Sequence, residues 1–216
     1  MTAHVQLQFT KDHRLFDSVR RLCIYLQATA IAKKVILGHN FNFEPGANII
    51  VQARHPPTAA KFPVHGPLEQ LVHFPLSEIG PIPIHIIDQP QLEGGVQVHG
   101  LEALNFNVFE VEFSLFYANY CEWIKKLVAD RRGNHHNWPE TWNFARIVRN
   151  AINHGGTINI DSRIGPTVSW RGIQFSHLNK GEVIREHIAC GDLFALMVDM
   201  DAELTVLSGP LQPYLP

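Results

Sequence analysis

Residues 144–156 read Phe144-Ala-Arg-Ile-Val-Arg-Asn-Ala-Ile-Asn-His-Gly-Gly156 and combine a helical pattern with a distinctive polar face. At about 100° of rotation per residue, the polar residues fall within an arc of about 140° and the apolar residues fill the opposite arc. This separation predicts an amphipathic helix that ends at the glycine pair. The polar arc comprises Asn143, Arg146, Arg149, Asn150, Asn153 and His154, with Trp142 inside it.

The polar arc contains arginine, asparagine and histidine but no Asp, Glu or Lys. A solvated helix face normally mixes both signs of charge and is rich in Lys and Glu. The composition therefore indicates a surface that binds an anion. Trp142 lies four residues before Arg146 and can stack on a base, on Arg146 or on a partner subunit.

The segment Arg149-Asn150-Ala-Ile-Asn-His154 resembles the Arg-polar-x-x-x-His motif of HEPN (higher eukaryote and prokaryote nucleotide-binding) domains. Residues 138–207 share a looser likeness with the same family. The resemblance implies a HEPN-like bundle of about four long helices. It also implies a metal-independent endoribonuclease without a cofactor, which cleaves RNA by attack of the 2′-OH in a toxin or antiviral defence setting. An antitoxin or regulatory protein is then a further candidate partner.

Cleavage of RNA without a metal requires a base, an acid and a fixed positive charge at the phosphate. Histidine exchanges a proton near neutral pH, and arginine donates two parallel hydrogen bonds while staying charged. Asparagine can orient either group. The candidate catalytic residues are therefore Arg149, Asn150 and His154, and the candidate substrate-binding residues are Arg146, Asn153 and Trp142.

Arg149 and His154 are five residues apart, so they diverge by about 140° around one helix axis. One helix places them poorly around a single phosphate, whereas two copies related by a two-fold axis surround it with two Arg and two His. The HEPN resemblance likewise implies a dimer with a composite site. We therefore expect a two-fold homodimer with the helix 138–154 of each subunit near the axis.

A second interpretation of the same residues stays open. Arg146 and Arg149 can pair with carboxylates on neighbouring helices, and His154 can cap the helix C-terminus, where a cation is favourable. The protein would then be a non-catalytic HEPN-fold dimer that binds a nucleotide, RNA or a protein partner.

The rest of the chain predicts a mainly α fold. Apolar residues at helical spacing predict four long helices near 12–37, 104–131, 138–154 and 190–207. The helix 104–131 carries two apolar stripes, one of which includes Val111 and Leu115, so we expect it to be covered on more than one side. Asn137, Pro139 and Glu140 are typical of a helix start with Asn137 as the cap.

Between residues 39 and 99 the chain is dense in proline, which excludes long helices. We expect a single HEPN-like domain, 1–216, with an irregular and partly β insertion at about 39–99. Strands are predicted at 4–9, as a sheet edge, and at 48–53 and 82–87, with a helical turn at 68–72. Before the last helix, 157–161 and 167–176 predict a β-hairpin that turns at Gly165-Pro166.

The composition of the 216 residues, 45% hydrophobic and 18% charged, is that of a globular protein. The net charge of −2 gives no global attraction to nucleic acid, so any anion site must be local. Three widely spaced cysteines, the absence of a basic-then-apolar leader and the absence of a long apolar run predict a cytoplasmic protein with no membrane partner. The 13 histidines show no metal-ligand spacing, so no metal site is predicted.

Overall fold

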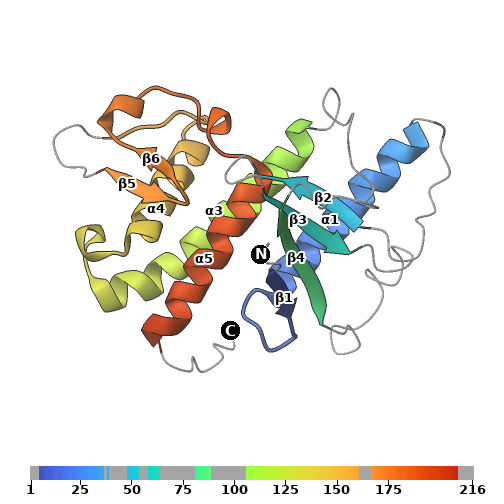
Figure 1. Ribbon diagram of the computed structural model, residues 1–216, viewed down its shortest axis with the longest axis horizontal. Coiled ribbons are helices and arrows are strands. Elements are labelled where there is room, and N and C mark those ends of the chain that lie inside the picture. Colours follow the sequence, from blue (N-terminus) through green and yellow to red (C-terminus); the bar gives the residue numbers. More distant parts are fainter. Residues whose placement is uncertain are drawn as a thin grey trace. The chain divides into compact units, whose positions relative to one another are not determined.

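In the computed structural model the chain is mainly helical and carries two small antiparallel sheets (Figure 1). The structure describes residues 5–36, 38, 48–53, 58–63, 81–88, 106–160 and 167–208. The α-helices among them are α1 (Phe16–Ile36), α3 (Phe106–Arg132), α4 (Glu140–Asn153) and α5 (Cys190–Ser208). Each overlaps a helix predicted from the sequence, so the prediction of a mainly α chain is confirmed.

The chain forms two compact units. The sheet unit holds α1 and four strands, β1 to β4. The helical unit comprises Ala53 and the described residues from Phe113 to Ser208, and it holds most of α3 together with α4 and α5. Because compact units can belong to one domain or to two, the single domain with an insertion stays a prediction.

The sheet unit is built on a four-stranded antiparallel sheet in the order β1-β4-β3-β2. Its strands are β1 (Val5–Phe9), β2 (Asn48–Gln52), β3 (Thr58–Pro63) and β4 (Ile82–Asp88), and α1 packs against β4. The predicted edge strand and the two strands near 48–53 and 82–87 are therefore present, whereas β3 was not predicted. Three of the four strands come from the segment 39–99, so the described part of this segment is more regular than expected. The predicted turn at 68–72 lies outside the described residues.

In the helical unit, α4 packs against α5 and against a short hairpin formed by β5 (Val168–Trp170) and β6 (Ile173–Phe175) (Figure 1). Phe144 of α4 is fully buried and stacks on Phe175, with ring centroids 4.9 Å apart. The ring centroid of Trp170, in the same hairpin, lies 5.7 Å from that of Phe144. The hairpin thus covers the apolar arc of α4 and leaves its polar arc on the other side.

The predicted hairpin between 157–161 and 167–176 is wrong. The strands that pair are β5 and β6, and they turn at Arg171 and Gly172, with φ values of 46° and 85°. A two-residue turn with both φ values positive matches the twist of the strands that it joins. Thr157 instead forms an isolated bridge with Val183, and Gly165-Pro166 lies outside the described residues.

The start of α4 also differs from the prediction. Asn137 ends a short 3₁₀ helix (His135–Asn137), and α4 begins at Glu140 after Pro139, without a side-chain cap. The Glu140 carboxylate accepts hydrogen bonds from the Ser169 backbone N–H, at 2.9 Å, and from its hydroxyl, at 2.7 Å. Glu140 therefore fastens the first turn of α4 to β5, and its negative charge suits the positive end of the helix.

The prediction that both apolar stripes of the helix 104–131 are buried is wrong. Val111 and Leu115 of α3 are 59% and 54% exposed, whereas Phe113 and Ile124 of the other stripe are fully buried. Apolar spacing shows which residues share a face of a helix but not whether a neighbouring element covers that face.

One buried hydrogen bond joins α3 to the middle of α4. The hydroxyl of Tyr117, which is fully buried, donates to the backbone oxygen of Ala145 at 3.0 Å. Tyr117→Phe should lower the free energy of unfolding of the helical unit by about 1 kcal/mol, because the buried hydrogen bond to the Ala145 backbone oxygen is lost. Urea denaturation measures this, with Tyr25→Phe, at a 48% exposed position of α1, as the control. Equal stability of both variants would show that the contact does not hold α3 on α4.

Candidate functional site

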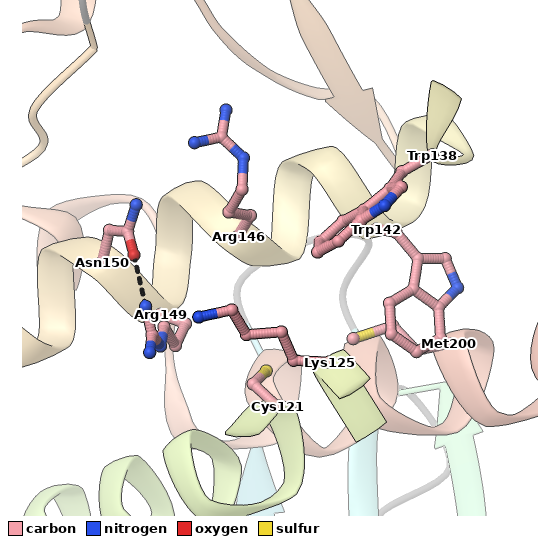
Figure 2. Close-up of a pocket in the computed structure, with 8 residues that line it drawn as sticks. All are labelled: Cys121, Lys125, Trp138, Trp142, Arg146, Arg149, Asn150 and Met200. Atoms are coloured by element: carbon pink, nitrogen blue, oxygen red, sulfur yellow. Dashed lines mark hydrogen bonds between the residues drawn. The ribbon is translucent and has the colours of Figure 1, made fainter. Parts of the chain in front are cut away.

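The polar arc of α4 borders a pocket of about 200 Å³ in the helical unit (Figure 2). The pocket brings together four of the predicted site residues with four residues that the sequence did not indicate. The predicted residues are Trp142, Arg146, Arg149 and Asn150, and the others are Cys121, Lys125, Trp138 and Met200. Among these described lining residues three are cations, two are tryptophans and none is a carboxylate. Lys125 of α3 thus adds a positive charge beside the polar arc of α4, for which the sequence predicts anion binding.

Arg149 is held by two partners. Its guanidinium forms an ion pair with Glu122 of α3, and it donates a hydrogen bond to the Asn150 side-chain oxygen at 2.8 Å, which is drawn as a dashed line in Figure 2. The Arg149 side chain is 22% exposed and that of Glu122 is 47% exposed. A phosphate that binds Arg149 must therefore displace the half-exposed Glu122 carboxylate or share the guanidinium with it. The hydrogen bond to Asn150 keeps the guanidinium in place.

Arg146 differs from Arg149 in having no ion pair among the described residues. Its Nε is buried without a hydrogen-bond partner, and burial lowers the pKa of the guanidinium. An arginine stays charged at neutral pH even so. Figure 2 shows the Arg146 guanidinium pointing away from Arg149 and Lys125. Arg146 therefore offers an uncompensated positive charge next to the Arg149 site and does not share that site.

His154 and Asn153 do not line this pocket. Both are exposed at the end of α4, where His154 is the C-cap residue. The cap hydrogen bonds come from the His154 backbone N–H, which reaches the Ala151 and Asn150 oxygens, and the chain then leaves through Gly155 and Gly156 with φ values of 77° and 81°. The His154 imidazole thus takes no part in these cap bonds and lies on the surface.

Asn143, the remaining member of the polar arc, has a structural role. Its side-chain amide donates to the backbone oxygens of His135 and Trp138, at 2.9 and 3.1 Å. The Trp138 indole N–H in turn donates to the Gly133 oxygen at 3.2 Å. These contacts fix the loop before α4 and set Trp138 at the wall of the pocket. Trp142 forms the neighbouring wall and is 2% exposed.

Cys121 is the candidate nucleophile in the pocket, but its environment disfavours the thiolate. Burial raises the pKa of Cys121 to about 12, and the hydrogen bond with Tyr117 and the charge of Arg149 only partly oppose this shift. A thiol with so high a pKa is almost fully protonated at neutral pH, and the thiolate is the reactive form. Cys121 therefore contributes an uncharged wall and does not act as a nucleophile.

No group of three or more His, Cys, Asp or Glu side chains that can hold a metal ion occurs in the described part of the chain. No helix among the described residues is long and apolar enough to cross a bilayer. Comparison with family models, curated proteins and solved structures finds no match to this chain. Any assignment of function therefore rests on the residues of α4 and of the pocket beside it.

Proposed function

We propose that this protein is a metal-independent endoribonuclease of HEPN type that acts on RNA, in a toxin or antiviral defence setting. The observation that carries the proposal is the arrangement on α4. Arg149 is oriented by Asn150 beside a pocket whose described lining residues include no carboxylate, and His154 ends the same helix with an exposed imidazole. These are the residue types that cleavage of a phosphodiester without a metal requires.

In the proposed reaction, a His154 imidazole takes the proton from the 2′-OH, and the 2′-oxygen forms a bond to phosphorus. The bond from phosphorus to the 5′-oxygen breaks, and the leaving oxygen receives a proton from the second His154 of the dimer. Arg149 binds the non-bridging oxygens, where negative charge increases in the transition state. The products are a 2′,3′-cyclic phosphate and a 5′-OH. End-group analysis of RNA cleaved in the presence of EDTA tests this chemistry directly, and a 3′-hydroxyl product would contradict it.

The proposal requires a homodimer, because Arg149 lines the pocket and His154 does not. With the α4 helices close to a two-fold axis, the His154 of one protomer can reach the phosphate held by Arg149 of the other. Sedimentation velocity at micromolar concentration should therefore give the mass of a dimer. A monomer under these conditions would contradict the composite site.

One observation favours a second candidate, a non-catalytic protein that binds RNA, a nucleotide or a protein partner. The Arg149 charge is already compensated by Glu122 within the chain. An antitoxin or regulatory protein would then contact the exposed end of α4. If RNA is the ligand, this candidate predicts binding that depends on Arg146 and Lys125. Whatever the ligand, it predicts that the wild-type protein cleaves no RNA.

A further inference from the structure

We propose that the pocket beside α4 binds one unstacked base of single-stranded RNA, with the base against Trp138 and the adjoining phosphate on Lys125. The pocket would thus favour unpaired RNA over duplex RNA. The inference rests on the proposed action on RNA and adds to it the two residues that contact the base and its phosphate. Both residues, Trp138 and Lys125, lie outside the sequence motif.

The aromatic walls are held in place before any ligand binds. Trp138, which is partly exposed, is anchored through its indole N–H to Gly133 and through its backbone oxygen to Asn143. The neighbouring Trp142 is 2% exposed and is fixed by its burial, so it supports the pocket but offers a base almost no surface. Rigid indoles lose little conformational freedom when a flat ring stacks on them. Every base has such a face, which is why proteins that bind single strands use aromatic side chains as stacking surfaces.

The charge of the pocket suits a base that is joined to a phosphate. Lys125, which is exposed on α3, directs its ammonium toward the Arg149 side of the pocket in Figure 2. Glu122 compensates Arg149, whereas no carboxylate among the described lining residues compensates Lys125. Because the net charge of the chain is −2, the chain as a whole does not attract polyanions. The positive charges at the pocket attract them only locally.

The size of the pocket favours a base over a whole nucleotide cofactor. Its volume of about 200 Å³ lies below the range of about 300–1,000 Å³ that encloses drug-sized ligands. Only part of a larger molecule can therefore enter. Met200, which is 1% exposed, and the protonated Cys121 complete the lining with uncharged sulfur-containing side chains that adapt to a ring. A base that is stacked in a duplex cannot reach such a pocket, whereas an unpaired base can.

Fluorescence anisotropy with short, labelled 2′-O-methyl RNA tests the pocket, because the blocked 2′-oxygen prevents cleavage. Trp138→Ala should weaken binding by about 5- to 150-fold, the loss expected for one stacked base, and Trp138→Phe should restore most of it. Lys125→Gln should weaken binding and reduce the slope of log K against log salt by about 0.7, the value for one phosphate of a single strand. Trp123→Ala and Lys180→Gln are the matched controls, since both side chains are exposed and lie outside the pocket.

The proposal is overturned if Trp138→Ala and Lys125→Gln bind as tightly as the controls, if the wild type does not bind the single strand, or if it binds duplex RNA equally well. These outcomes are independent of cleavage. If the pocket variants lose affinity as expected while wild-type protein cleaves no RNA, the pocket proposal stands and the nuclease proposal fails. If RNA is cleaved but the pocket variants bind as the wild type does, the nuclease proposal stands and the pocket proposal fails.

Discussion

Replacing Arg149 by alanine should reduce the rate of RNA cleavage by about 10²- to 10³-fold, the usual loss when one preorganised donor to the transition-state charge is removed. Arg149→Lys should be almost as impaired, because an ammonium cannot make the two parallel contacts of a guanidinium or keep the hydrogen bond geometry with Asn150. Single-turnover cleavage of a labelled RNA measures both variants. Cleavage by Arg149→Ala at the wild-type rate would exclude Arg149 from the reaction.

Glu122→Gln is the matched control for Arg149. It removes the competing carboxylate and keeps the shape of the side chain, so RNA should bind more tightly and cleavage should not decrease. The Arg149–Glu122 pair is partly exposed, and such pairs stabilise proteins by only about 0–1 kcal/mol. Neither Glu122→Gln nor Arg149→Ala should therefore unfold at a much lower urea concentration than the wild type. A large loss of stability in Arg149→Ala would point instead to the structural interpretation, in which Arg149 only joins α3 to α4.

His154→Ala should reduce cleavage by about 10²- to 10⁴-fold, the range of general acid–base catalysis. Its effect on stability should be small, because the side chain is exposed and the cap hydrogen bonds of α4 are made by the backbone. His177→Ala, at another exposed histidine of the helical unit, is the control and should cleave as the wild type does. If the two variants have equal rates, proton transfer does not involve His154.

The helices were predictable because their signals are local. Apolar residues at three- and four-residue spacing marked all four described helices, and Gly38, Gly133 and Gly155 end three of them with positive φ values, a backbone region that favours glycine. The apolar arc of α4 is buried as the pattern predicted, since Phe144 and Val148 are both fully buried. A periodic pattern of this kind reports which side of a helix meets the protein interior.

The parts that were missed depend on contacts between segments far apart in the sequence. Lys125 and Trp138 join the site only because α3 and the loop before α4 pack beside the motif helix. Nothing in the spacing of α3 distinguishes Lys125 from a solvated lysine. The ion pair of Arg149 with Glu122 likewise follows from packing, and it is the kind of pairing that the second interpretation of α4 predicts. The hairpin turn was missed because Arg171 takes a positive φ, which an arginine does not signal.

The central claim is that the residues of α4 cleave RNA without a metal, and one comparison tests it most directly. Purified wild-type protein and the His154→Ala variant are incubated with the same single-stranded RNA in the presence of EDTA, and the cleaved fraction is followed with time. The claim predicts cleavage by the wild type to 2′,3′-cyclic phosphate ends and a rate at least about a hundredfold lower for His154→Ala. Equal cleavage by both proteins, or none by either, would contradict it.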